Sequence, residues 1–322
     1  MTLLISDADV RQACDMDRLV EVITTALQIE ARGGVQMVPR VNFGIENGFF
    51  RLMPAVIEEL DVMGFKAFDA KVPDARYLLA LFTPSTGELD CLIDAAYLTA
   101  ARTGATTAIA TRAMTDPEGC AEVGVIGSGL EARTNLEAIM AVRDVKNVKV
   151  FSPRPESRER FAREIEDTFN VAAQPVATCE EAAGAPCVLA ATNTGFGGPI
   201  ALEGRMLQDG AHLNTIGATA PTLREVDSAT FSRAAEVVLD TEHAHAECGD
   251  ILAAQADGSW DDSRVRMLTD VLETRRPRDG QITVFKSVGT AVQDLAAGFA
   301  VAQIARERGL GRELDIVLPK TF

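Results

Sequence analysis

The spacing of apolar residues divides the first third of the chain into three kinds of segment. From Asp15 to Gly34 apolar residues recur about every 3.6 positions, which predicts a helix, and Ser6 is placed to cap a short turn before it. From Val38 to Asp94 short runs rich in Val, Phe and Leu alternate with turn residues, which predicts strands of a mixed or antiparallel sheet. The Ala- and Thr-rich stretch 95–114 predicts a second helix.

Beyond a turn at 116–119, short apolar strands alternate with amphipathic helices. The predicted strands are 122–126, 148–151, 187–191, 211–216 and 235–239, and the predicted helices are 131–142 and 156–169. This alternation is typical of a parallel sheet with helices on both faces. A last helix, 291–308, ends before Gly309, and we expect it to pack back on the first domain.

The predicted fold class is therefore α/β, with two domains. Residues 118–294 form a Rossmann domain with a doubly wound parallel sheet. Residues 1–117 and 295–322 together form a discontinuous α+β domain.

A glycine motif lies where the first strand of the second domain meets its helix. Gly127 and Gly129 begin a G-x-G-x-x-A pattern that ends at Ala132, with Ser128 between the two glycines. In dinucleotide-binding folds the first glycine permits a tight turn, the second lets a pyrophosphate approach the backbone, and the third position allows the helix to pack closely on the strand. An ordinary tight turn is the alternative, but the strand before and the helix after favour binding of NAD(H) or NADP(H).

The end of the next strand bears on the choice of cofactor. An Asp or Glu there would bond the ribose hydroxyls and favour NAD, but the chain has Ser152 and Arg154. These two side chains are suited to a 2′-phosphate, although Arg154 between two prolines is equally typical of a solvated loop. The choice between NADH and NADPH stays open at this point.

Charge and cysteine content exclude several classes of function. The 322 residues have a net charge of −16, which opposes binding to nucleic acid or to an anionic membrane surface. The six cysteines have no C-x-x-C spacing, so we expect reduced thiols in a cytoplasmic protein, and we find no export signal and no membrane-spanning run. His243 and His245 are spaced so that their side chains diverge on a helix, and we predict no metal site.

Cations recur in the first domain of this acidic protein. Arg40, Lys66 and Arg102 are each flanked by apolar or turn residues, and any one of them alone is more typical of a solvated sheet edge. Arg51 and Met53 share one face of a strand, so a cation and an apolar side chain point into the same space. A pocket for a small anion needs donors of this kind, because Arg binds a carboxylate through two hydrogen bonds.

Short motifs in a fixed order give a more specific indication than any single residue. They lie at 38–40, 52–55, 64–66, 86–87, 98–105, 126–129, 190–192, 210–218, 247–250 and 285–289. This ordered set resembles the ornithine cyclodeaminase/mu-crystallin family, which includes archaeal-type alanine dehydrogenases and ketimine reductases. The resemblance covers nearly the whole chain.

The resemblance implies a homodimer in which the discontinuous domain forms the substrate pocket and the subunit interface. It implies that Arg40, Lys66 and Arg102 bind the substrate carboxylate beside the nicotinamide, and that Val288 borders the substrate. The positions that it assigns to the cofactor are Thr103, Leu130, Glu131, Ser152, Thr192, Ile216, Gly217, Ala218, Thr219 and Ser287.

Two departures from the family pattern bear on the substrate. Ornithine cyclodeaminases have an Asp, placed to handle the substrate amine, at the position of Thr219, and a hydroxyl is not an anionic base at neutral pH. The segment between Lys66 and Arg102 is shorter than in the family and has Lys71 and Arg76. Both departures favour a substrate without a cationic side chain.

The expected activity is reduction of a small imino acid by NAD(P)H, or the reverse oxidation of an amino acid. Arg40, Lys66 and Arg102 would hold the carboxylate, with Lys66 also suited to proton transfer. Arg51 suggests a second carboxylate, so the most favoured substrate is iminosuccinate, which gives L-aspartate. Alanine dehydrogenase and cyclic ketimine reductase are the alternatives, followed by ornithine cyclodeaminase and by a protein that binds NAD(P) and a ligand without turnover.

Overall fold

The computed structural model describes residues 1–46, 48–70, 75–272 and 280–315, so Lys71 lies outside the described residues. The chain divides into two compact units, which are Met1–Arg102 together with the chain from Thr290 onward, and Thr103–Gly289. The first boundary lies inside helix α3 (Ala96–Met114), not at the expected 117/118, and the second lies at 289/290 instead of 294/295. The turn after Met114 therefore ends a helix, while the helix itself continues from one unit into the other.

The first unit contains a mixed sheet, as the sequence predicts. Its strand order is β16-β1-β7-β6-β5-β4-β2, with β3 paired to β4. β1 and β7 are parallel, while β3 to β7 form successive antiparallel pairs. The strands are β1 (Thr2–Ile5), β2 (Gln36–Met37), β3 (Val41–Ile45), β4 (Gly48–Ile57), β5 (Val62–Asp69), β6 (Arg76–Phe82), β7 (Leu89–Asp94) and β16 (Arg312–Leu314).

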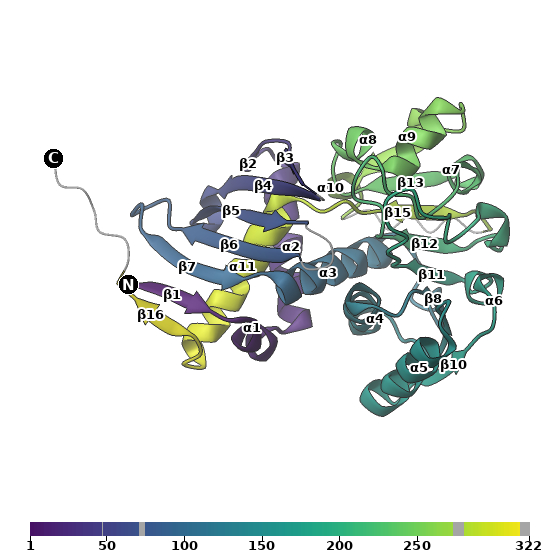
Figure 1. Ribbon diagram of the computed structural model, residues 1–322, viewed down its shortest axis with the longest axis horizontal. Coiled ribbons are helices and arrows are strands. Elements are labelled where there is room, and N and C mark those ends of the chain that lie inside the picture. The colour runs from purple at the N-terminus through teal and green to yellow at the C-terminus, as the bar shows by residue number, and fades with distance from the viewer. Residues whose placement is uncertain (47, 71–74, 273–279, 316–322) are drawn as a thin grey trace. The chain divides into compact units, whose positions relative to one another are not determined.

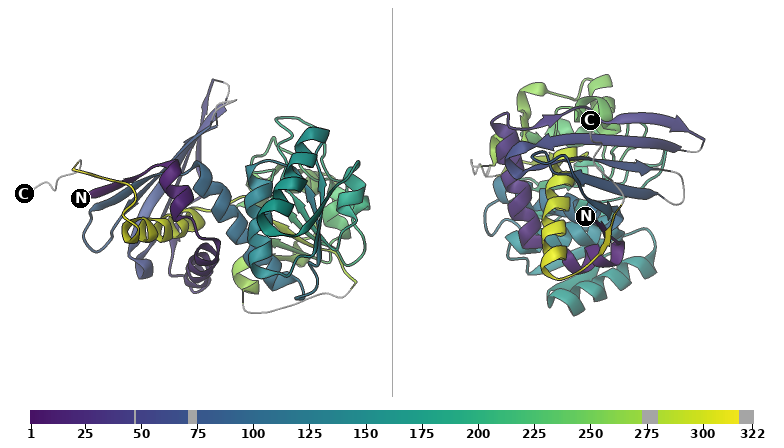
Figure 2. Two further views of the ribbon diagram at one scale, coloured as in Figure 1. Left: turned by 90° about the horizontal axis from the view of Figure 1, so that it is seen from below. Right: turned by 90° about the vertical axis from the view of Figure 1, so that its left-hand side faces the viewer.

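Helices cover this sheet and include the last helix of the described residues. They are α1 (Asp7–Ala13), α2 (Met16–Ala31), the short η1 (Glu58–Leu60) and α11 (Ala291–Glu307). Ser6 caps α1 in a capping box with Asp9, as predicted. Helix α11 lies beside α2 and across β4, β5 and β6 (Figure 2). Its Gly298 permits the close approach, because a Cβ there would lie 2.3 Å from a methyl carbon of Leu79.

The second unit contains a parallel sheet with the order β10-β9-β8-β11-β12-β15-β13-β14 (Figure 1). Every pair of neighbouring strands in it is parallel. The order reverses between β8 and β11, which is the doubly wound arrangement. The strands are β8 (Glu122–Ile126), β9 (Asn147–Phe151), β10 (Ala172–Pro175), β11 (Cys187–Ala190), β12 (His212–Thr215), β13 (Glu236–Leu239), β14 (Val265–Met267) and β15 (Thr283–Lys286).

Two apolar cores lie on the two faces of this parallel sheet. In β11, Leu189 belongs to a core with residues of α4 and α5, while Val188 belongs to the other core with residues of α6, α7 and α9. This alternation is the period of two that a strand buried on both faces requires. The helices are α4 (Leu130–Val142), α5 (Pro155–Phe169), α6 (Cys179–Ala183), α7 (Ser228–Arg233), α8 (Ala244–Glu247), α9 (Gly249–Ala256) and α10 (Leu268–Val271), with η2 (Gly204–Met206) and η3 (Asp262–Arg264).

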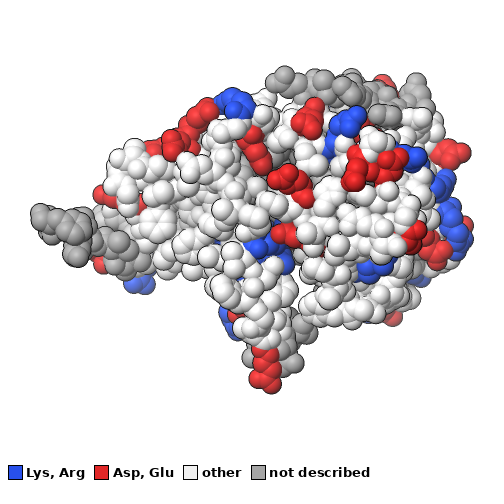
Figure 3. Space-filling view, turned by 90° about the horizontal axis from the view of Figure 1, so that it is seen from above, with Lys and Arg blue, Asp and Glu red and all other residues white. Residues whose placement is uncertain are grey.

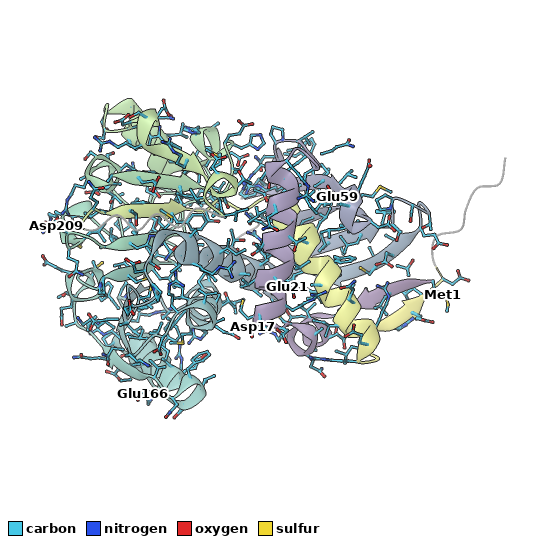
Figure 4. All side chains as sticks on the ribbon, turned by 180° about the vertical axis from the view of Figure 1, so that it is seen from behind. Met1, Asp17, Glu21, Glu59, Glu166 and Asp209 are labelled. Carbon is cyan, nitrogen blue, oxygen red and sulfur yellow. The ribbon has the colours of Figure 1, made fainter. Side chains whose placement is uncertain are left out.

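The acidic charge of the chain is largely at its surface. Asp17 and Glu21 project from α2 and Glu166 from α5, all exposed (Figure 4). On the face in Figure 3 acidic and basic side chains are interspersed. Within the described residues, no helix is both long and apolar enough to cross a membrane.

Candidate active site

The loop after β8 has the geometry of a phosphate-binding turn. Gly127 has a φ of 122°, which favours glycine, and a Cβ there would lie 2.2 Å from the carbonyl oxygen of Ala191. A Cβ at Gly129 would contact no atom of the described chain beyond its sequence neighbours. Because Gly129 is the N-cap of α4, the N–H groups of the first turn are available to an anion, and this loop fits the diphosphate of a dinucleotide.

A cleft of about 800 Å³ opens beside this loop, at the carboxyl ends of β8, β9 and β11. This is the place where open α/β sheets bind ligands. It is lined by several of the residues that the sequence assigns to the cofactor, namely Gly127, Ser128, Gly129, Leu130, Glu131, Ser152, Arg154 and Thr192. The other assigned cofactor residues are not among its lining residues, and these are Thr103, Ile216, Gly217, Ala218, Thr219 and Ser287.

Polar contacts fix the end of β9 against the glycine loop. The Oγ atoms of Ser128 and Ser152 lie 3.0 Å apart, and Arg158 donates to the carbonyl of Ser152 at 3.2 Å. Arg154 is exposed and lines the cleft. No Asp or Glu follows β9 directly, so this end of the cleft offers hydroxyl and guanidinium groups where an NAD-specific site has a carboxylate.

Arg133 also shapes the loop, although the sequence analysis does not identify it. It donates to the carbonyl oxygens of Ser128 and Gly129 and forms an ion pair with Glu164 at 2.7 Å. A cation in the first turns of a helix is electrostatically unfavourable, and that placement is the signal that points to a local role.

In the first unit, three elements bring Lys66, Arg102 and Asp294 together. Lys66 comes from β5, Arg102 from the first turns of α3, and Asp294 from α11. Asp294 Oδ1 accepts hydrogen bonds from Lys66 Nζ and from Arg102 Nε, both at 2.8 Å. Gln293 Oε1 accepts from Arg102 at 3.0 Å. The structure thus places two of the three predicted carboxylate-binding residues on one buried carboxylate that the sequence analysis missed.

Lys66 has an unusual environment for a lysine. It is 2% exposed, and its ammonium lies 5.6 Å from the ring centroid of Phe68. Burial lowers the pKa of Lys66 to about 7, Asp294 works against this shift, and the charges of Arg102 and Arg40 add to it. Lys66 is therefore able to hold or release a proton near neutral pH, as the sequence analysis expects.

Arg51 and Met53 are both buried and lie on the same face of β4. In the β4–β5 ladder Met53 is opposite Lys66, and Arg51 is opposite Phe68. Directly opposed residues in an antiparallel pair share a face, so Arg51 lies diagonally from Lys66, a spacing of about 7–8 Å between Cα positions. The Arg51 guanidinium donates to Asn42 Oδ1 at 2.7 Å and lies 4.7 Å from the ring centroid of Phe49.

Buried carboxylates hold the remaining loops at the carboxyl end of the parallel sheet. Glu225 accepts hydrogen bonds from Thr192, Ile216 and Gly217. Asp240 accepts from Ser287 Oγ at 2.7 Å and from the backbone of Val288 at 3.0 Å. Thr219 is half-buried in the loop after β12. Neither carboxylate is identified by the sequence analysis.

The histidines and cysteines do not form a recognisable catalytic or metal-binding group in the described residues. His243 and His245 are half-buried around the short helix α8, and His212 is buried between Thr283 and Asn214. All six cysteines are free thiols. In the described ranges of the chain no group of three or more His, Cys, Asp or Glu is arranged to hold a metal ion.

Comparisons with known proteins agree with this arrangement. The sequence profile of the ornithine cyclodeaminase/mu-crystallin family matches residues 1–309. Alanine dehydrogenase of Archaeoglobus fulgidus is 28% identical over 97% of this chain and 98% of its own, and ketimine reductase mu-crystallin of Mus musculus is 31% identical over 82% and 84%. The structure of Thermococcus litoralis Δ1-pyrroline-2-carboxylate reductase in complex with NADH and L-proline superposes with a TM-score of 0.91, with 26% identity, 97% coverage of this chain and 100% of its own.

Proposed function

The chain belongs to the ornithine cyclodeaminase/mu-crystallin family, and from this premise we propose that it reduces iminosuccinate to L-aspartate with NAD(P)H. It is an NAD(P)-dependent oxidoreductase that acts on imines and amino acids. The observation that supports iminosuccinate is the buried Arg51. It lies on the same face of the sheet as Lys66, at the diagonal position on the neighbouring strand.

The two ends of the substrate would engage different cations. The α-carboxylate binds Arg102 and Lys66, with Arg40 contributing positive charge. The second carboxylate binds Arg51, because a diagonal spacing on the sheet suits two anionic groups on a four-carbon chain. A substrate with an ammonium at this position would meet a like charge in a buried site, which is strongly unfavourable.

Lys66 supplies the proton in this scheme. When bound, the reduced nicotinamide supplies the hydride that adds to the imine carbon. The imine nitrogen takes one proton from Lys66 Nζ, so the C=N bond becomes a CH–NH group, and solvent restores the proton to Lys66. Arg102 and Asp294 hold Lys66 in place, and orientation of the substrate carboxylate accounts for much of the acceleration.

The relatives and the sequence leave two further substrate classes to compare. Relatives named alanine dehydrogenase and Δ1-pyrroline-2-carboxylate reductase favour the imine of pyruvate and a cyclic imine. Cyclodeamination is disfavoured because Thr219 offers a hydroxyl where that reaction uses a carboxylate. A ligand-binding protein without turnover is distinguished by the same assay.

The test is oxidation of reduced cofactor followed at 340 nm. Oxaloacetate with ammonia, pyruvate with ammonia and Δ1-pyrroline-2-carboxylate are each supplied with NADH and with NADPH. We expect the highest kcat/KM with oxaloacetate and ammonia. A preference for pyruvate or for the cyclic imine would refute the dicarboxylate assignment, and no turnover with any of them would favour the binding protein.

A variant of Arg51 distinguishes binding of the second carboxylate from a structural role of this side chain. Arg51→Ala is expected to lower kcat/KM for oxaloacetate with ammonia by about 100-fold, since a charged hydrogen bond contributes about 1.5–3 kcal/mol, and to affect pyruvate much less. Arg76→Ala, an exposed arginine on the same sheet, is the matched control. Equal losses for both substrates would show that Arg51 is structural.

We also propose that the protein is a homodimer in the cytoplasm. Strand β3 is exposed along its whole length, and its Phe43 and Ile45 are 55% and 43% exposed. A row of exposed apolar side chains on a sheet edge is suited to burial against a second copy of the chain. Sedimentation of the wild type and of Phe43→Ser tests this, with dissociation expected in the variant. The free thiols are in keeping with a reducing compartment.

A further inference from the structure

A group of buried ionisable side chains lies at the carboxyl ends of β11, β12 and β15. It consists of Glu225, Asp240, Asp250 and Lys286, each at most 4% exposed. None of these groups takes part in the chemistry proposed above. Buried charges are retained only where they are paired or hydrogen-bonded, so their contacts indicate what they do.

Glu225 connects two strand ends through both of its carboxylate oxygens. Oε1 accepts from the backbone N–H and the hydroxyl of Thr192, at 2.7 and 2.8 Å, just after β11. Oε2 accepts from the Thr215 hydroxyl at 2.6 Å and from the N–H groups of Ile216 and Gly217 at 3.0 and 2.7 Å, at the end of β12. A Cβ at Gly217 would lie 2.4 Å from Glu225 Oε1, so glycine is needed for this approach.

Asp250 holds Glu225 in turn. Its Oδ1 accepts from the backbone N–H groups of Glu225 and Val226, at 2.8 and 3.2 Å. Its Oδ2 lies 3.6 Å from Nζ of Lys286, which brings positive charge into the group. The segment that contains Glu225 is therefore held twice. Its backbone N–H groups donate to Asp250, and the Glu225 side chain accepts from the loops after β11 and β12.

These contacts surround the half of the sheet that binds the second nucleotide of a dinucleotide. A doubly wound fold binds one mononucleotide over each half of the sheet, and the cleft at β8 and β9 belongs to the first half. We propose that Glu225 is a positioning residue that sets the loops after β11 and β12 for the nicotinamide half of the cofactor. This inference rests on the proposed function.

A carboxylate suits this position better than an amide. Five donors converge on its two oxygens, and a glutamine would turn its NH₂ group toward one set of them. Burial raises the pKa of Glu225, while Lys286 and these hydrogen bonds oppose that shift. The arrangement thus supports two loops at once only while Glu225 accepts through both oxygens.

The experiment compares ligands that differ in the nicotinamide. Binding of NAD(P)H and of ADP-ribose, which lacks the nicotinamide, is measured by titration calorimetry on wild type, Glu225→Gln and Glu236→Gln. Glu236 is a buried glutamate at the amino end of β13, so the control makes the same chemical change at the opposite end of the sheet. Binding needs no substrate, so failure of the wild type to bind NAD(P)H refutes the proposed function, not this inference alone.

We expect Glu225→Gln to weaken NAD(P)H by about tenfold or more, equivalent to about 1.4 kcal/mol, with ADP-ribose changed less than about twofold. Equal weakening of both ligands, or no change in either, would overturn the proposal. Thr215→Val removes one of the five hydrogen bonds without altering shape, and the same selective loss, smaller in size, is expected. This second variant keeps the test decisive if Glu225→Gln does not fold.

Discussion

Binding of an anionic substrate is expected to raise the pKa of Lys66 and so to protonate its side chain. In the free protein burial lowers the pKa of Lys66 to about 7, so the side chain is about half protonated at pH 7 and about one-tenth protonated at pH 8. A carboxylate about 4 Å from the ammonium contributes about 4 kcal/mol at an effective dielectric of 20, which raises the pKa by about three units. The bound state is then protonated throughout this range.

The uptake of protons on binding follows from the difference between the two states. It is about 0.1 at pH 6, about 0.5 at pH 7 and about 0.9 at pH 8. Because the free protein must gain a proton in order to bind, the Kd is expected to rise with pH above about 7 and to approach tenfold per pH unit. Below pH 6 Lys66 is protonated in both the free and the bound protein, so its titration should no longer change the Kd.

Calorimetry in two buffers measures this directly. Succinate, which has two carboxylates and no C=N bond to reduce, is titrated in phosphate and in Tris with oxidised cofactor present. The number of protons taken up is the difference between the two binding enthalpies divided by the difference in buffer ionisation enthalpy. Lys66→Met should abolish the uptake, whereas Lys146→Met, at an exposed lysine, should not. Uptake near zero at pH 8 in the wild type, or unchanged uptake in Lys66→Met, would refute the reasoning.

Three further predictions concern other parts of the two sites. Asp294→Asn removes the charge that opposes the lowering of the Lys66 pKa, so the alkaline limb of kcat/KM should move to lower pH by about 1 to 3 units, whereas Asp90→Asn should leave the pH profile unchanged. Arg154→Ala should weaken NADPH about tenfold in a fluorescence titration and leave NADH unchanged, because only NADPH has the 2′-phosphate. Gly127→Ala should lower the free energy of unfolding by about 1–3 kcal/mol and abolish cofactor binding. The φ at this position is strained for alanine, and the added Cβ would clash with the carbonyl of Ala191. Urea titration with and without NADH measures both effects.

Most of the fold follows from periodicity, and the exceptions have physical causes. Strands such as β8 and helices such as α11 begin and end within one or two residues of the predicted bounds, because their apolar spacing continues to the ends. Strand β15 (Thr283–Lys286) is not predicted, since a lysine at its end suggests a loop when its burial is unknown. The unit boundary inside α3 has no signal, because a helix that crosses between units keeps its pattern.

The sequence identifies backbone motifs of the site better than its buried carboxylates. Gly127 is recognisable because the turn requires glycine within a fixed local spacing. Asp294 lies 228 positions from Lys66, and only the packing of α11 beside β5 brings them together. Glu225 likewise meets Thr192 across 33 positions. A carboxylate that stabilises a residue distant in sequence is not predicted by any local sequence pattern.

The two buried charge clusters differ in how their oxygens are used, and this difference separates a binding role from a positioning role. All the oxygens of Glu225 and Asp240 accept hydrogen bonds from neighbouring backbone or hydroxyl groups, so excess negative charge there is stabilised internally and holds loops in place. In the first unit, Asp294 shares a single oxygen between Lys66 and Arg102, while Arg40 adds positive charge nearby. One carboxylate oxygen thus accepts from two cationic side chains, whereas each oxygen of Glu225 and Asp240 accepts from neutral donors, and this is the difference that separates the proposed binding site from the proposed positioning site.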